Sequence, residues 1–200
     1  MVGRAIPMLA AAVLLAGCYL PVRFDAEITI DRSGYYNAQF DGYMVSVPLY
    51  QGLKDGTISA LDEKAKIADL QTDVTRDSAI SDFKYVRQGH FRLKWRDKGD
   101  LIKTRMVTFL RRSESILNLK YVKSTRLITV EATPIADANA RRLKAEGLDM
   151  QGQLRVRTDA RVVTHNAGRV IDDKAGRGKV YIWEVKSVTD APPRIVIAPG

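Results

Sequence analysis

Cysteine and histidine are almost absent from this sequence. Of its 200 residues one is a cysteine, Cys18, and two are histidines, His90 and His165. A single cysteine excludes an internal disulfide and a Cys-x-x-Cys redox or zinc motif. The sequence also has no His-x-x-x-His pair and no EF-hand pattern. We therefore predict no metal site and interpret both histidines as surface residues.

Motifs for catalysis are missing as well. No Gly-x-Ser-x-Gly motif presents a nucleophilic serine, and no pair of carboxylates stands out as a glycosidase site. Gly176-Arg177-Gly178 lacks the further glycines and the strand-to-helix setting of a dinucleotide fingerprint. Asp172-Asp173 precedes this glycine-rich turn and is interpreted as solvated. We therefore predict a protein that is not an enzyme, has no catalytic residue and needs no cofactor.

The first 17 residues have the composition of an export signal. Arg4 supplies a positive charge, and the uncharged stretch that follows ends at Ala16. This stretch is too short for a membrane-spanning helix, which needs about 20 apolar residues. It runs into Leu15-Ala16-Gly17-Cys18, a lipobox in which small residues precede the cysteine that receives a diacylglyceryl group. The sequence predicts a cleaved signal peptide over 1–17 and lipid attachment at Cys18, the first residue of a domain over 18–200.

Lipidation would decide where the protein resides. Two acyl chains on one cysteine anchor a protein stably to a membrane surface. We expect a lipoprotein of the cell envelope that faces the periplasm and contacts the membrane through Cys18. Tyr19 stands where an Asp would retain a lipoprotein at the inner membrane of a Gram-negative bacterium, so it favours the outer membrane if the source is Gram-negative. Because no hydrophobic span closes the sequence, we expect the lipid to be its only anchor.

Basic residues outnumber acidic ones. Lys and Arg number 32 against 23 Asp and Glu, a net charge of +9. Residues 1–17 hold one of these basic residues, Arg4, and no acidic one, so the mature chain keeps a net +8. Because export separates the domain from nucleic acid, the remaining polyanions are anionic lipid head groups, lipopolysaccharide and other envelope polymers. A solvated basic surface without a dedicated partner is the alternative.

Alternation of apolar and polar residues predicts strands along most of the domain. Strands are expected over 22–30, 35–47, 91–96, 101–110, 113–123, 126–133, 154–156, 162–163, 180–185 and 194–198. The first two form a hairpin, and those between 91 and 133 form an antiparallel meander. The fold class is α+β, a single domain whose predominantly antiparallel sheet carries two helices.

The two helices are predicted from their spacing and ends. The first covers 57–71, with Ser59 and Asp62 as a capping pair. Its apolar stripe contains Ile58, Leu61, Ala65 and Ala68, widened by Ile67 and Leu70. The second begins at Thr133-Pro134 and ends before Gly147, which suits the position after a helix. Pro48 and Gly52 are interpreted as breaks between elements.

The segment from Phe91 to Arg96 combines an apolar face with a cationic one. Phe91, Leu93 and Trp95 alternate with basic residues, which predicts a half-buried strand. Residues 97–100 are interpreted as a turn that leads into a second strand with further basic residues. The candidate face for an anionic partner consists of Arg92, Lys94, Arg96, Lys103 and Arg105. Arginine suits phosphate because it binds in a bidentate way. A strand face that prevents aggregation is the alternative.

The C-terminal third contains three short motifs. They are Gly152-Gln153-Leu154-Arg155-Val156, Val162-Val163-Thr164-His165-Asn166-Ala167 and Tyr181-Ile182-Trp183-Glu184-Val185. In this order they resemble the LppM-type lipoprotein domain family, with Asn166 in the turn and Trp183 on a later strand as the best-matching positions. The resemblance implies a non-catalytic, envelope-associated module that contacts lipids. We interpret Trp95 and Trp183 as core residues.

These observations leave three functional hypotheses. The first is a non-catalytic, lipid-anchored envelope lipoprotein that binds lipid or anionic envelope components. The alternative is an accessory or scaffold subunit that tethers an envelope protein complex to the membrane. The third is a hydrolase with an unrecognised site. A large apolar cavity would favour the first, an exposed apolar patch on a solid core the second, and a cleft with converging carboxylates or a His–Ser pair the third.

Overall fold

The computed structural model describes residues 19–110, 116–174, 176 and 178–200. The predicted signal peptide over 1–17 and Cys18, the predicted site of lipid attachment, lie outside the described residues, and so do 113–115 of a predicted strand and Arg177. Within the described part the chain forms one domain with twelve strands in two sheets and four helices. The predicted mixed, mostly antiparallel single domain is confirmed.

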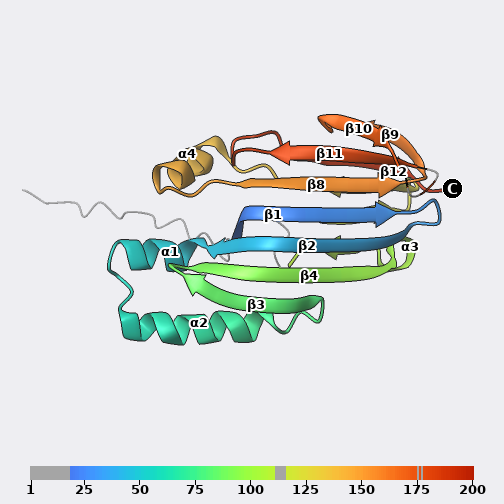
Figure 1. The fold of residues 1–200 in the computed structure, drawn as a ribbon. Coiled ribbons are helices and arrows are strands. Elements are labelled where there is room, and N and C mark those ends of the chain that lie inside the picture. Colours follow the sequence, from blue (N-terminus) through green and yellow to red (C-terminus); the bar gives the residue numbers. More distant parts are fainter. Residues whose placement is uncertain (1–18, 111–115, 175, 177) are drawn as a thin grey trace, which may run out of the picture.

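The larger sheet has seven strands, and Figure 1 shows it face-on with the smaller sheet behind it. Its order is β10-β11-β8-β1-β2-β4-β3. The strands are β1 (Tyr19–Ile30), β2 (Tyr35–Ser46), β3 (Ile80–Arg87), β4 (His90–Asp100), β8 (Gln151–Thr158), β10 (Arg169–Asp172) and β11 (Lys179–Val185). All neighbours are antiparallel except β1 and β8, which run parallel. The predicted hairpin is formed by β1 and β2.

The smaller sheet has five antiparallel strands in the order β5-β6-β7-β12-β9. The strands are β5 (Met106–Thr108), β6 (Asn118–Val122), β7 (Leu127–Glu131), β9 (Arg161–His165) and β12 (Arg194–Ala198). Because a strand rises about 3.3 Å per residue, strands of 3 to 5 residues are less than half as long as the 12 residues of β1 and β2. The smaller sheet therefore covers only part of the larger one.

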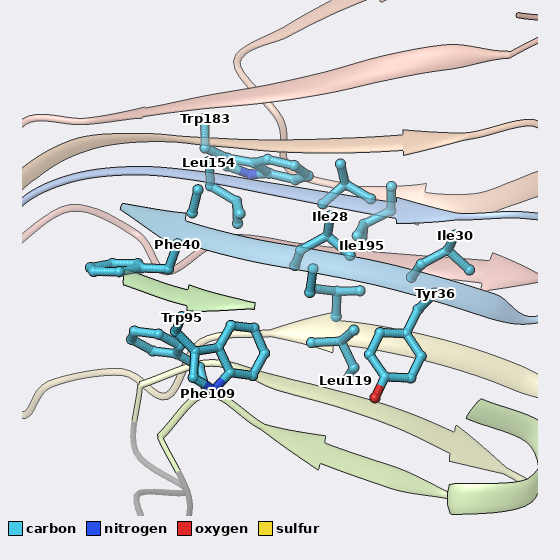
Figure 2. Close-up of a cluster of buried hydrophobic side chains, with 14 of the residues drawn as sticks. Ile28, Ile30, Tyr36, Phe40, Trp95, Phe109, Leu119, Leu154, Trp183 and Ile195 are labelled. Carbon is cyan, nitrogen blue, oxygen red and sulfur yellow. The ribbon is translucent and has the colours of Figure 1, made fainter. Parts of the chain in front are cut away.

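The main core lies between the two sheets. Ile28 and Ile30 of β1 face Leu119 of β6 and Ile195 of β12, and all four side chains are at most 2% exposed (Figure 2). Trp95 and Trp183 are 3% and 5% exposed, which confirms their prediction as core residues. The same close-up shows aromatic side chains of Phe40, Trp95 and Phe109 gathered at one end of this core.

The prediction of two helices is wrong, because the described chain has four: α1 (Val47–Lys54), α2 (Ala60–Val74), α3 (Leu101–Thr104) and α4 (Asp137–Ala145). Pro48 and Gly52, interpreted as breaks between elements, both lie in α1, with Pro48 in its first turn. A proline is tolerated there because its missing amide would have no partner inside the helix. The predicted start of α4 at Thr133-Pro134 is also wrong, since the helix begins at Asp137 without a side-chain cap. Gly147 follows its end, as predicted, with φ of +86°.

The predicted cap of helix α2 is confirmed, and its predicted buried face is only partly correct. The Ser59 side chain accepts a hydrogen bond from the amide of Asp62. Of the predicted stripe, however, Leu61, Ala65 and Ala68 are exposed, with Leu61 at 81%. Ile67 and Leu70, the residues predicted to widen the stripe, are half-buried, and Val74 at the end of the helix is buried. The alanines and leucine that suggested a stripe were too few and too small to decide which face is buried.

The region after Trp95 differs from the prediction. Residues 97–100, interpreted as a turn, continue β4 and pair with β2 as far as Asp100. In the expected strand over 101–110, Leu101–Thr104 form α3 and only Met106–Thr108 are strand. The side chain of Asp100 accepts hydrogen bonds from the amides of Ile102 and Lys103 and so begins this helix. The predicted meander is therefore divided, with β4 in the larger sheet and β5 to β7 in the smaller.

Candidate functional site

A cavity of about 610 Å³ lies between the two sheets and extends beneath α4. This volume falls within the range of about 300–1,000 Å³ that is usual for small-molecule sites. Its interior is lined by Phe24, Ala26, Ile28, Ala38, Phe40, Trp95, Phe109, Leu119 and Leu154. Toward α4 the lining consists of Ile135, Leu143, Met150, Val185 and the segment 188–193. The described lining is thus mainly hydrocarbon and aromatic.

Small residues on the central strands explain why this space stays open. In the strand register Phe24 of β1 lies between Gly42 of β2 and Gly152 of β8. A Cβ on Gly152 would lie 2.6 Å from the Phe24 ring, and one on Gly42 would lie 2.8 Å from the Phe24 Cβ, so the two glycines make room for the Phe24 side chain, which lines the cavity. Further along β1 and β2, Ala26 and Ala38 also face inward and line the cavity. Their short side chains leave room between the sheets at these positions.

An aromatic series forms part of the wall. The rings of Phe24 and Phe40 are stacked at 5.8 Å, and Phe40 packs against Phe109 at 4.5 Å. Trp95 meets Phe109 edge-on at 5.3 Å (Figure 2). These contacts join the two sheets, since Phe109 follows β5 of the smaller sheet. They form an aromatic wall on one side of the cavity.

Two polar atoms of the lining are buried without a hydrogen-bond partner among the described residues. They are the indole Nε1 of Trp95 and the hydroxyl oxygen of Tyr19. Burial raises the pKa of the Tyr19 hydroxyl to about 12, and the Asp73 carboxylate adds to this shift. Tyr19 therefore stays protonated at physiological pH. Both groups are hydrogen-bond donors, but their own atoms have almost no accessible surface.

The edge of the cavity is polar and solvent-exposed. Of the lining residues only Asp137, Arg142 and Asp190 carry a charge, and all three are exposed. Asp190 accepts hydrogen bonds from the amides of Lys186 and Ser187 at 2.7 and 3.0 Å. These bonds fold the segment that precedes β12 into a turn beside α4.

Asp149 also holds the segment that precedes β12. Its carboxylate accepts a hydrogen bond from the amide of Val188 at 2.7 Å and another from Met150 at 2.9 Å. Partial burial works to raise the pKa of Asp149, but these amide hydrogen bonds, with Ser187 and the Lys144 ammonium, outweigh it and lower the pKa. Since Val188 and Met150 both line the cavity, Asp149 holds part of its wall.

The strand with the predicted cationic face has the expected alternation. Phe91, Leu93 and Trp95 are buried, and Arg92, Lys94 and Arg96 point to the outer face of the larger sheet. Sequence alone did not reveal Asp41 on the neighbouring strand β2. The Arg92 guanidinium forms an ion pair with Asp41, and the Lys94 ammonium lies 3.8 Å from the same carboxylate. The face is therefore partly neutralised.

Lys103 and Arg105 do not extend this face, which corrects the prediction that a second strand carries them. Lys103 lies in α3 and pairs with Asp100 at 3.3 Å. Arg105 follows α3 with φ of 68° and places its guanidinium 5.2 Å from the centre of the Tyr121 ring. The five predicted cations thus belong to two separate places on the molecule.

A second outer-face cluster was not predicted. Arg155 of β8 pairs with Asp25 and Glu27 of β1, and Arg157 pairs with Glu27 and Asp173. The alternation of acids on β1 and arginines on β8 was visible in the sequence. Their contact depends on the parallel pairing of β1 with β8, and no local pattern shows which distant strands are neighbours.

The histidines do not form part of a titratable cluster within the described ranges. His90 contacts the Tyr50 ring edge-on at 5.8 Å, and His165 contacts the Tyr181 ring at 4.8 Å. No group of three or more His, Cys, Asp or Glu side chains in the described part is placed to hold a metal ion. Among the same residues no helix has both the length and the apolar character needed to cross a membrane.

Comparison with known proteins adds little to this description. No protein-family model matches the chain, and no curated protein matches it. Among solved structures it is similar to the folded domain of Mycobacterium tuberculosis LppM, determined by NMR. The identity is 13%, the match covers 88% of each chain, and the TM-score is 0.43. At this level of likeness neither a ligand nor a residue role is carried over.

Proposed function

We propose that this protein is a non-catalytic lipoprotein of the cell envelope that binds the acyl chain of a lipid between its two sheets. The observation that carries the proposal is the apolar cavity of about 610 Å³. Of the three hypotheses drawn from the sequence, a large apolar cavity favours lipid binding. A solid core would have favoured a role as an accessory subunit.

The energetics of an acyl chain suit such a cavity. Each buried methylene contributes about 0.8 kcal/mol, so roughly 14 methylenes contribute about 11 kcal/mol. Association costs about 4 kcal/mol or more, which leaves roughly 7 kcal/mol and a dissociation constant near the micromolar range. The open edge beside α4, with Asp137, Arg142 and Asp190, leaves a polar head group in contact with water.

The proposed membrane attachment agrees with this activity. The lipobox ends at Cys18, and Tyr19 directly after it lines the cavity. A lipid on Cys18 would hold the cavity close to a membrane surface from which ligands are taken. Metabolic labelling with an alkyne fatty acid tests the attachment. We expect label on the wild-type protein and none on Cys18→Ser, and unlabelled wild-type protein would contradict it.

Titration calorimetry with monopalmitoyl glycerol tests lipid binding. The full chain with Cys18→Ser serves as the parent, because it keeps all described residues and carries no lipid of its own. Ala26→Leu and Ala38→Leu place larger side chains in the cavity, and we expect each to weaken binding at least tenfold. Asn37→Leu adds the same group to the exposed face of β2 next to Ala38 and should bind like the parent. Folded parent protein that binds no lipid would overturn the proposal.

A further inference from the structure

The start of β1 brings the predicted site of lipid attachment next to the cavity. The first three residues of β1, which are Tyr19, Leu20 and Pro21, all line the cavity. Cys18 directly precedes Tyr19 in the sequence, and consecutive Cα atoms are about 3.8 Å apart. A lipid on Cys18 would therefore begin within one peptide unit of the cavity wall.

The start of β1 also lies at the solvent-exposed edge of the cavity. Figure 1 shows β1 beginning at the end of the larger sheet where α4 lies. Leu20 packs in one apolar cluster with Leu143 of α4 and with Val188, and all three residues line the cavity. The exposed lining residues Arg142 and Asp190 follow this cluster closely in the sequence, next to Leu143 and two residues after Val188. A chain attached at the start of β1 therefore begins on the side from which a lipid would enter.

From this edge the apolar lining continues along β1. It includes Phe24, Ala26 and Ile28, and Ile28 lies eight residues beyond Leu20. At about 3.3 Å per residue, this part of the strand is about 26 Å long. A hydrocarbon chain that enters beside Leu20 is thus in contact with apolar lining along most of β1.

Attachment gives such a chain an advantage over a free lipid. A short tether raises its effective concentration to the millimolar range, which is on the order of 10³ times the micromolar dissociation constant expected for a free acyl chain. The bilayer offers the same chain an apolar environment as well. Entry into the cavity additionally supplies contacts to wall atoms, which an empty apolar space lacks.

We infer that an acyl chain of the lipid on Cys18 occupies the cavity when no other lipid is bound. This inference rests on the proposed function, that is, on the lipid at Cys18 and on the cavity as a lipid site, and it adds how the site is regulated. A free lipid that binds displaces the tethered chain, which then returns to the membrane. Because two acyl chains anchor a protein stably and one only marginally, ligand binding strengthens membrane attachment. By linkage, firm attachment in turn favours ligand binding.

Photocrosslinking of the lipidated full chain tests this occupant. Cells that produce the protein are supplied with a palmitate analogue that carries a diazirine, and crosslinks are mapped by mass spectrometry after irradiation. We expect crosslinks within one polypeptide to Phe24, Phe40 or Leu154 of the cavity wall. Ala38→Leu narrows the cavity and should reduce these crosslinks about tenfold, because overpacking weakens occupancy by that order. Asn37→Leu adds the same group to the exposed face of β2 and should crosslink like the wild type.

A second measurement needs no substitution. Excess monopalmitoyl glycerol, added to membranes of the labelled cells before irradiation, should reduce the wall crosslinks of the wild-type protein. Labelled protein that crosslinks to phospholipid alone would overturn this inference, and it would leave lipid binding intact if the Cys18→Ser chain binds monopalmitoyl glycerol. Protein that takes up no label, or a folded Cys18→Ser chain that binds no lipid, would overturn the proposed function and this inference with it.

Discussion

The side-chain oxygen of Asn166 accepts a hydrogen bond from the indole nitrogen of Trp183 at 2.8 Å and another from the amide of Arg194 at 2.8 Å. Its side-chain nitrogen donates to the carbonyl of Pro192 at 2.9 Å. Asn166 lies in the link between β9 and β10, which belong to different sheets. One exposed side chain therefore joins β11 of the larger sheet to the start of β12 in the smaller one, and it also fixes a segment of the cavity wall.

Asn166→Ala should lower the free energy of unfolding by about 2 kcal/mol. The reason is that Trp183, 5% exposed, would keep a buried indole N–H without its acceptor. Urea denaturation measures the effect, and Thr164→Ala on the exposed side of β9 is a control expected to stay within about 0.5 kcal/mol.

The double variant Asn166→Ala with Trp183→Phe separates this cause from lost packing. Phenylalanine has no N–H group, so the two changes together should cost less than the sum of the two single changes. Strict additivity would show that the Asn166–Trp183 hydrogen bond does not stabilise the fold.

Gly42→Ala should destabilise the protein by about 2 kcal/mol or more. A Cβ at this position would lie 2.5 Å from the backbone oxygen of Arg23 and 2.8 Å from the Cβ of Phe24, and backbone atoms in the centre of a sheet cannot move aside cheaply. Gly168→Ala is the matched control, because the only atom near its Cβ is 4.0 Å away. Thermal unfolding compares the two. Similar melting temperatures would show that the close approach of β1 and β2 at Phe24 does not require glycine.

The strands were the part of the fold that the sequence predicted best. The alternation in 22–30 reflects one buried and one solvated face, a local property that the structure confirms in β1. The strand expected over 194–198 is also present as β12, although Ile195, Val196 and Ile197 are all buried. The order of the strands was not predictable in this way. β8 pairs in parallel with β1, more than 100 residues earlier, and the chain changes sheets between β9 and β10. Such pairings depend on packing between distant segments.

The cavity itself could not be predicted for the same reason. Gly42, Gly152, Ala26 and Ala38 are ordinary small residues in their own segments. Pairing of β2, β1 and β8 brings the two glycines to either side of Phe24, and Ala26 and Ala38 line the cavity on the same strands. The cationic face was predicted correctly as alternation along one strand, but its neutralisation by Asp41 depends on the register between β2 and β4.

Low pH should weaken the contacts of Asp149 with the segment that contains Val188 and so lower the stability of the fold. The pKa of Asp149 is lowered in the folded protein, because its amide hydrogen bonds outweigh the effect of burial. A lowered pKa means that this carboxylate stabilises the fold above its unfolded-state value of about 3.9. That contribution is lost as the pH falls through the folded-state pKa.

Asp149→Asn tests this linkage, since it keeps the size of the side chain and removes the charge. We expect the parent to be more stable than Asp149→Asn at neutral pH, with the difference shrinking below about pH 4. Hydrogen exchange at the amide of Val188 should become faster in the variant at neutral pH. A stability difference that does not change with pH would show that the carboxylate charge has no part in holding this wall.

Asp41 should weaken attraction between the outer face of the larger sheet and anionic membranes. Its carboxylate pairs with Arg92 and lies near Lys94, so it removes charge from the centre of the predicted face. We expect Asp41→Asn in the Cys18→Ser full chain to increase binding to anionic vesicles at low salt. Arg96→Ser, which removes an exposed cation, should decrease it.

Vesicle co-sedimentation at low and high salt measures both changes, and neutral vesicles are the control. Because the charges are exposed, the differences should disappear at high ionic strength, where the Debye length falls to about 3 Å at 1 M. Arg92→Ser is a less direct probe. Its guanidinium also donates to the carbonyl of Gly42 at 2.8 Å and lies over the Tyr43 ring, so its loss should lower stability as well. If Asp41→Asn and Arg96→Ser both bind anionic vesicles like the parent, this face makes no contact with anionic lipid, and the proposed lipid on Cys18 would be left as the membrane contact.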